Sequence, residues 1–147
     1  MKLLIDADGC PVVDIAVRLC RHHSCGCILL CDTAHTMNRE GAETLVFDKG
    51  ADSVDFALVN RVDSGDIVVT QDYGLASMCL ARGAQVHHQD GWSYTADNID
   101  ALLFQRHASA KHRRSGGRIK GPKKRTPEQD KSFALAMERI LQTTIQG

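Results

Sequence analysis

Two aspartates near the start of the chain have the residue type and spacing that suit cation-dependent chemistry. Asp6 and Asp8 follow the apolar run LLI at residues 3–5, which predicts a short buried strand. Side chains two residues apart in an extended segment point the same way, so both carboxylates are expected to project beyond the carboxyl end of that strand. Ligands of open parallel sheets bind just outside this edge. The pair therefore predicts a ligand site at the carboxyl edge of a sheet.

Further aspartates are expected to join this site. Asp72 follows the apolar run DIVVT at 66–70, and the first and fourth strands are neighbours in the common doubly wound strand orders. Asp52 and Asp55 lie three residues apart at the start of a predicted helix, where they share one helical face. Asp is also a preferred helix N-cap residue, and that role stays open for Asp52 and Asp72.

Carboxylates gathered in this way need a compensating charge. They raise one another's pKa unless a cation joins them, and Mg²⁺ or Mn²⁺ accepts such oxygen ligands. These ions stabilise the charge of a phosphoryl transition state and activate water for attack. The sequence thus predicts metal-dependent phosphate-ester chemistry, and the residues predicted to be both catalytic and metal-binding are Asp6, Asp8, Asp55 and Asp72.

The charge distribution along the chain predicts a surface for an anionic partner. The net charge is zero, yet residues 1–105 carry seven basic and fifteen acidic side chains, whereas residues 106–147 carry eleven and three. Glycines interrupt the basic run, and they let a backbone approach a phosphate closely. We expect this run to bind RNA or another phosphate-bearing substrate, with a solvated loop as the alternative. The predicted nucleic-acid-binding residues are Lys111, Arg113, Arg114, Arg118, Lys120, Lys123, Lys124 and Arg125.

Short apolar runs alternate with helical patterns over most of the chain. This alternation predicts an α/β fold, a three-layer α/β/α sandwich with a mainly parallel sheet, in a single domain over residues 1–147. A basic loop is expected at about 106–125. A C-terminal helix is expected at about 126–145, because Thr126 can cap it, with Gln129 three residues later. The expected strands are 3–5, 27–31, 43–47, 66–70 and 84–88.

The composition also bears on compartment and on the thiols. No apolar run approaches the roughly 20 residues of a membrane span, and MKLLIDADG lacks the apolar region of a secretory signal, so a cytoplasmic protein is predicted. The six cysteines contain no C-x-x-C pair, which favours reduced thiols over a metal or disulfide framework. Cys10 stands before a predicted helix N-terminus, where a thiolate would be favoured.

Four motifs resemble one known family. LIDADGCPV at 4–12, GADSVDFALVNR at 50–61, GDIVVTQDYGLA at 65–76 and RRSGGRIKGPKKRTPEQDKSF at 113–133 are similar to the YaiI/YqxD family of bacterial proteins, which is linked to PIN/NYN-like nuclease domains. The resemblance implies a PIN-like fold and a metal-dependent nuclease centre directed at RNA. It makes Asp6 and Asp8 the first-strand acids, Asp55 the helix acid and Asp72 the fourth-strand acid. Phe56 stands where the family often has a second acid.

Two other functions remain open from the sequence. The DADG segment at 6–9 also resembles the first motif of haloacid-dehalogenase-like phosphatases, in which the first Asp is a nucleophile. That superfamily also uses a Lys and an acidic pair after a later strand, and TQDYGLA offers one acid without a preceding Lys. The other alternative is a non-catalytic RNA-binding protein that keeps the acids for folding.

Overall fold

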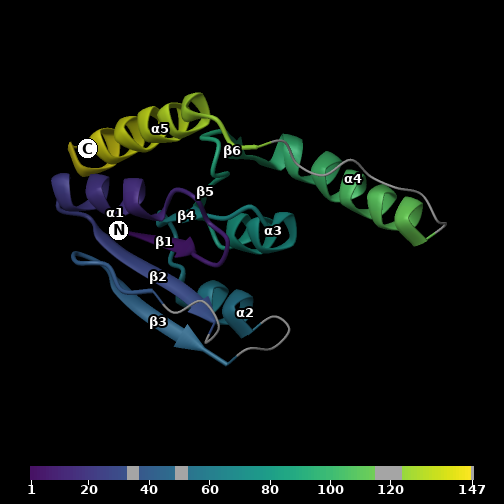
Figure 1. Cartoon of the computed structure of the whole chain (residues 1–147), viewed down its shortest axis with the longest axis horizontal. Coiled ribbons are helices and arrows are strands. Elements are labelled where there is room, and N and C mark those ends of the chain that lie inside the picture. The colour runs from purple at the N-terminus through teal and green to yellow at the C-terminus, as the bar shows by residue number, and fades with distance from the viewer. Residues whose placement is uncertain (33–36, 49–52, 115–123, 147) are drawn as a thin grey trace.

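The computed structural model describes residues 1–32, 37–48, 53–114 and 124–146, and it describes the backbone alone for 106–114 and 144–146. Strands and helices alternate along most of the chain, as the apolar runs predict (Figure 1). In chain order the elements are β1 (Lys2–Asp6), α1 (Val13–His22), β2 (Gly26–Asp32), β3 (Glu43–Phe47), α2 (Ser53–Arg61), β4 (Ile67–Val69), α3 (Tyr73–Ala81), β5 (Gln85–His87), β6 (Ser93–Tyr94), α4 (Ala96–Arg114) and α5 (Pro127–Gln146).

The strands form one sheet of order β3-β2-β1-β4-β5-β6. All neighbouring strands are parallel except β5 and β6, which are antiparallel. β1 lies between β2 and β4, and Leu4 pairs with Ile28 on one side and Val68 on the other. The strand order therefore reverses at the boundary between β1 and β4, which is where parallel α/β sheets bind ligands.

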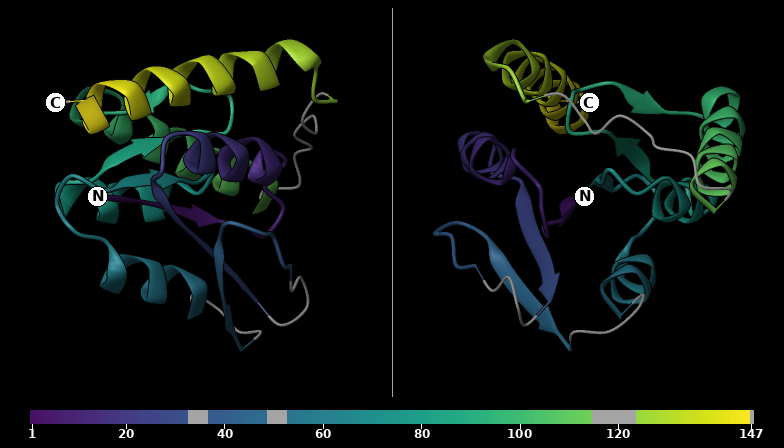
Figure 2. Two further views of the ribbon diagram at one scale, coloured as in Figure 1. Left: turned by 90° about the vertical axis from the view of Figure 1, so that its left-hand side faces the viewer. Right: turned by 45° about the vertical axis from the view of Figure 1, so that its right-hand side comes forward.

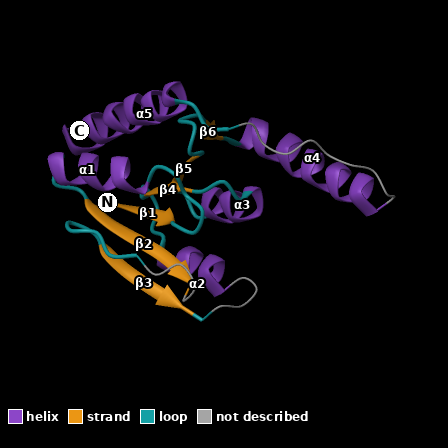
Figure 3. Cartoon of the chain, in the orientation of Figure 1, coloured by secondary structure: helices purple, strands orange, loops and turns teal. Residues whose placement is uncertain are grey.

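Side chains of β1 alternate between two buried layers. Leu3 and Ile5 pack with α1 and α5, whereas Leu4 packs with α2, α3 and α4 on the other face. Figures 2 and 3 show helices flanking the sheet in this way. The α/β class and the three-layer arrangement are confirmed, and the architecture is consistent with the PIN-like fold that the resemblance implies.

The ends of the last two helices show how local sequence sets element boundaries. Thr95 and Asn98 cap α4 reciprocally, since the Asn98 backbone N–H donates to Thr95 Oγ1 at 3.2 Å and the Thr95 N–H to Asn98 Oδ1 at 2.9 Å. The side chain of Gln129 caps α5 by accepting the Thr126 N–H at 2.7 Å. Among the described residues, no helix is long and apolar enough to cross a bilayer.

The basic loop expected at about 106–125 needs a correction. Helix α4 continues to Arg114, so residues 106–114 are helical. They contain no Gly or Pro and are rich in Ala, Lys and Arg, which favour helix. The first helix-breaking residue after them is Gly116. The C-terminal part of α4 extends away from the sheet (Figure 1).

A buried ion pair joins the first strand to the turn before the fourth. Asp66 is 2% exposed, and its carboxylate accepts from Lys2 Nζ at 2.6 Å, the Lys2 N–H at 3.0 Å and the Asp63 N–H at 2.8 Å. Burial alone would raise the pKa of Asp66, but these hydrogen bonds outweigh it and the pKa lies below its ordinary value. The ionised carboxylate therefore stabilises the fold.

Replacing Asp66 by Asn is expected to lower the free energy of unfolding by roughly 1–3 kcal/mol at neutral pH, because charge-assisted hydrogen bonds to Lys2 and Asp63 are lost. Since the folded pKa is depressed, the contribution is complete above the ordinary value of 3.8 and is lost as the pH falls below it. Urea unfolding at about pH 7 and about pH 3 measures this. If D66N lowers the free energy of unfolding by the same amount at both pH values, Asp66 is not stabilised as an ionised carboxylate.

Candidate functional site

Asp6 lies at the boundary between β1 and β4 and is held by the residue that follows β4. Ile5 pairs with Val69, so the next residues, Asp6 and Thr70, lie side by side at the carboxyl ends of the two strands. Thr70 Oγ1 donates to Asp6 Oδ2 at 2.9 Å and accepts from the Asp72 N–H at 3.0 Å. Thr70 is 1% exposed, and the Tyr94 hydroxyl donates to its carbonyl oxygen at 3.1 Å. Thr70 therefore positions Asp6 relative to Asp72.

Asp8 turns toward the opposite neighbour of β1. The Asp32 N–H at the end of β2 donates to Asp8 Oδ2 at 3.1 Å. Asp8 belongs to a turn, in which the Cys10 N–H donates to the Ala7 carbonyl at 3.1 Å and Gly9 has a φ of +69°. The expectation that the extended segment reaches Asp8 was wrong, because β1 ends at Asp6. Hydrogen bonds from Thr70, just after β4, and from Asp32, at the end of β2, thus hold the two carboxylates on different sides of β1.

The pKa of Asp6 shows which acidic residues influence it. The pKa of Asp6 is raised from 3.8 to about 6, mainly by burial, against the opposing hydrogen bond from Thr70. The negative charges of Asp55, Asp72 and Asp8 raise this pKa further. The structure therefore brings the four aspartates predicted from the sequence into one electrostatic neighbourhood. Asp52 lies outside the described residues.

The thiol of Cys79, a buried residue of α3, is affected by two of the same acids. Burial raises the pKa of Cys79 to about 12, and the charges of Asp55 and Asp6 raise it as well, while Arg82 lowers it. Asp55 stands in the first turn of α2, so its charge reaches the region between α2, α3 and β1. The helix acid and the strand acid therefore both influence the same buried residue of α3.

The chemistry of these side chains suits a hard divalent cation. The cluster offers carboxylate oxygens from β1, from the turn after it and from the ends of α2 and α3, which are the ligands that Mg²⁺ and Mn²⁺ prefer. The raised pKa of Asp6 shows that nearby protein groups leave its negative charge undercompensated. A bound cation would supply the missing compensation.

Asp72 also caps a helix. Its Oδ1 accepts the Gly74 N–H at 2.9 Å and the Leu75 N–H at 3.2 Å, which makes it the N-cap of α3. The capping role left open from the sequence is therefore present at Asp72. The cap uses one carboxylate oxygen, so capping and cation binding are compatible.

The sequence did not predict the role of Thr70, and its prediction for Cys10 was wrong. Thr70 was missed, although Thr70 and Asp72 stand two residues apart at a strand end, the same spacing as Asp6 and Asp8. Cys10 was expected to favour a thiolate, but burial raises its pKa to about 11, against a hydrogen bond from Val12 and the charge of Arg125. Cys10 is therefore a protonated thiol.

The predicted nucleic-acid-binding residues fall into four groups, the last of which is Arg125 alone. Lys111, Arg113 and Arg114 lie on the last turns of α4, while Arg118, Lys120 and Lys123 are outside the described residues. Lys124 is exposed.

Arg125 is already engaged within the fold. Its guanidinium contacts Asp90 Oδ1 at 2.7 Å, Asp130 Oδ1 at 2.7 Å and the Gln89 carbonyl at 2.8 Å. These contacts tie the start of α5 to the turn after β5. The charge of Arg125 also reaches Cys10, which places this cation near the turn that follows Asp8.

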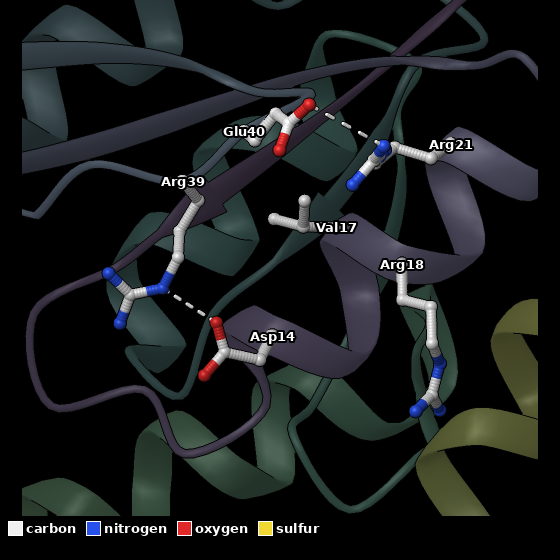
Figure 4. Close-up of a pocket in the computed structure, with 6 residues that line it drawn as sticks. All are labelled: Asp14, Val17, Arg18, Arg21, Arg39 and Glu40. Carbon is white, nitrogen blue, oxygen red and sulfur yellow. Dashed lines mark hydrogen bonds and ion pairs between the residues drawn. The ribbon is translucent and has the colours of Figure 1, made fainter.

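A surface with three arginines and two acidic residues lies along α1 and the segment before β3. It surrounds a hollow of about 390 Å³ (Figure 4). Arg39 pairs with Asp14 at 2.6 Å and Arg21 with Glu40 at 3.9 Å. Arg18 points away from both carboxylates in Figure 4. The hollow is lined by Asp14, Val17, Arg18, Arg21, Arg39 and Glu40.

Comparison with known proteins places the chain in a family. A family model described as "Uncharacterized BCR, YaiI/YqxD family" matches residues 4–143. The chain is 55% identical to a UPF0178 protein of Exiguobacterium sibiricum over 141 residues, which cover 96% of each chain. It is 46% identical to a UPF0178 protein of Clostridium acetobutylicum over 143 residues, which cover 96% of this chain and 97% of the relative. No solved structure matches the chain. With four motifs and a full-length match in agreement, the chain belongs to the YaiI/YqxD family.

Proposed function

We propose that this protein is a divalent-metal-dependent hydrolase that cleaves RNA phosphodiesters at the aspartate cluster. The observation that carries the proposal is Asp6, a carboxylate at the β1–β4 boundary whose pKa is raised to about 6 by burial and by Asp55, Asp72 and Asp8. Such a carboxylate gains from a cation, and the site lies where parallel sheets bind ligands. The resemblance to PIN/NYN-like domains supports RNA as the substrate.

Each acidic residue has a distinct part in this proposal. Asp6, Asp8 and Asp72 would hold Mg²⁺ or Mn²⁺, which when bound stabilises phosphoryl charge and lowers the pKa of water. Asp55, which approaches from α2, would orient a water molecule or hold a second ion. Thr70 keeps the Asp6 carboxylate in place through its 2.9 Å hydrogen bond.

RNA would be held by the basic segment of the chain. Lys111, Arg113, Arg114, Arg118, Lys120, Lys123, Lys124 and Arg125 remain the proposed contacts, and each phosphate contact makes affinity depend on salt. Phe56, next to Asp55 in α2, is 60% exposed, so its ring is accessible to a base for stacking. The aromatic residue therefore supports a nucleic-acid partner at the position where the family often has an acid.

The direct test is an RNA cleavage assay. End-labelled single-stranded and hairpin RNAs are incubated with the protein in Mn²⁺, in Mg²⁺ and in EDTA, and cleavage is expected with either metal but not in EDTA. RNA binding that survives EDTA, without cleavage in any metal, would instead indicate a non-catalytic RNA-binding protein. A trapped phospho-aspartate at Asp6 would indicate a haloacid-dehalogenase-like phosphatase.

Two substitutions separate the cap of α3 from the proposed metal ligand. Asp72→Ser keeps a good N-cap and should change the free energy of unfolding by less than about 0.5 kcal/mol, whereas Asp72→Ala should lower it by roughly 1 kcal/mol. Both remove the carboxylate, so both should lower the cleavage rate by roughly 10-fold or more. Urea unfolding and single-turnover cleavage measure the two effects. If D72S cleaves at the wild-type rate, Asp72 is a cap alone.

A further inference from the structure

A second group of possible metal ligands lies between α1 and α5. His22 is the last residue of α1, His23 follows it, and Glu138 belongs to α5. One ligand atom from each of the three residues lies within 4.8 Å of the other two. His23 Nε2 and Glu138 Oε1 are 2.8 Å apart, and the two imidazole rings meet edge to face with centroids 5.0 Å apart. Residues distant in sequence thus present two nitrogens and one oxygen to one point.

The backbone at the end of α1 fixes the two histidines. The His23 N–H donates to the Leu19 carbonyl at 3.1 Å, and the Cys25 N–H returns to the Cys20 carbonyl at 2.8 Å. Ser24 between them has a φ of 56°, the left-handed conformation that ends many helices. The carbonyl groups at a helix C-terminus carry partial negative charge, which favours a nearby cation.

Contacts of its own helix, α5, hold Glu138 in place. Gln142, one turn later in α5, donates from Nε2 to Glu138 Oε1 at 3.3 Å. Phe133, Met137 and Leu141 of the same helix are fully buried against α1 and the sheet, so the helix that carries Glu138 is packed in place. Figures 1 and 2 show α1 and α5 side by side. Outer contacts of this kind orient metal ligands in known sites.

We infer that His22, His23 and Glu138 form a Zn²⁺ site that joins the end of α1 to α5. Two imidazoles and one carboxylate are a known zinc ligand set, with a fourth position left for water. Two ligand atoms bound to one tetrahedral Zn²⁺ lie roughly 3.4 Å apart at bond lengths of about 2.1 Å. The three ligand atoms lie within 4.8 Å of one another, and the 2.8 Å contact between His23 and Glu138 would be replaced by bonds to the ion. The mixed nitrogen and oxygen set favours zinc over the hard cations proposed at the aspartate cluster.

This zinc site is independent of the proposed nuclease centre. Helix α1 follows the carboxyl end of β1 and ends just before β2 begins, so its last residues lie at the opposite edge of the sheet from Asp6. The site would fasten the C-terminal helix to the body of the fold. Its expected consequence is metal-dependent stability, whether or not the aspartate cluster is catalytic.

Calorimetric titration of Zn²⁺ into the metal-free, reduced, full-length chain without a polyhistidine tag tests the inference. One Zn²⁺ per chain is expected to bind in a step that His22 and Glu138 control, and free Zn²⁺ at about 100 times the Kd of this step should raise Tm by roughly 5–10 °C. His22→Gln and Glu138→Gln should each weaken binding by roughly 10-fold or more. Glu128→Gln, an exposed position of the same helix, should bind as wild type does.

Cobalt spectroscopy tests whether cysteines take part in metal binding. The Co²⁺-substituted protein should show tetrahedral d–d bands without a thiolate charge-transfer band. Circular dichroism and Tm in EDTA check that the variants fold. Absence of Zn²⁺ binding by wild type, an affinity unchanged in both H22Q and E138Q, or a thiolate band in the Co²⁺ protein would each overturn the site.

Discussion

Replacing Asp6 by Asn is expected to lower metal-dependent RNA cleavage by roughly 100-fold or more and to stabilise the metal-free protein. The loss of activity follows from its proposed position as a metal ligand, since changes even to groups that only support a ligand cost about 10- to 100-fold. The gain in stability follows from burial, because ionising this carboxyl group in the fold is unfavourable. Asn keeps an oxygen that can accept the Thr70 hydrogen bond.

The pH dependence of this stabilisation has a definite sign. The pKa of Asp6 rises from 3.8 to about 6 on folding, so the wild-type protein loses stability relative to D6N as the pH rises through that interval. The full difference is reached above about pH 6 and amounts to roughly 1–3 kcal/mol. Urea unfolding in EDTA at about pH 4 and about pH 7.5 should show the difference only at the higher pH.

The matched control for this experiment is Asp100→Asn, an exposed aspartate in α4. It should leave the cleavage rate unchanged and change the free energy of unfolding by less than about 0.5 kcal/mol. A D6N protein that cleaves RNA at the wild-type rate would remove Asp6 from the proposed centre. A D6N protein that is less stable than wild type at neutral pH would show that Asp6 serves the fold.

Replacing Phe133 by Ala is expected to have the largest effect on stability, a loss of roughly 3–5 kcal/mol. Phe133 is 0% exposed and lies in the layer formed by α5, α1 and the face of β1 that carries Ile5. Truncation removes the ring from this layer and leaves a cavity that the packed helices can fill only in part. Thermal and urea unfolding measure the loss.

Leu135→Ala on the same helix is the matched control, because Leu135 is 66% exposed. It should lower the free energy of unfolding by less than about 0.5 kcal/mol, since no cavity forms. Equal losses for F133A and L135A would contradict the packing of α5 on the sheet through Phe133. They would also weaken the zinc inference, which needs Glu138 to be held against α1.

The parts of the site that follow from local sequence were predictable. Apolar runs that end at Asp6 and before Asp72 predict two strand ends, and the doubly wound order places those strands side by side, as observed for β1 and β4. Helix starts were predictable where a cap residue marks them, as at Thr126. The charge distribution identified the basic segment but not its helical first part, because composition alone does not locate the end of α4.

Contacts between distant segments were not predictable in the same way. The bond from Thr70 to Asp6 depends on strand register, and the turn of Asp8 toward Asp32 depends on the conformation of Gly9. β6 has two residues, too few to show an alternating pattern. The contact of His23 with Glu138 joins residues 115 positions apart, which no local pattern encodes.

The central claim is that the aspartate cluster binds a divalent cation, and anomalous diffraction from Mn²⁺-soaked crystals tests it most directly. The account predicts an anomalous peak at a distance of about 2.0–2.4 Å from a carboxylate oxygen of Asp6 and from one of Asp8 or Asp72. A saturating soak that leaves these carboxylates without a peak, or places Mn²⁺ only elsewhere on the chain, would contradict it.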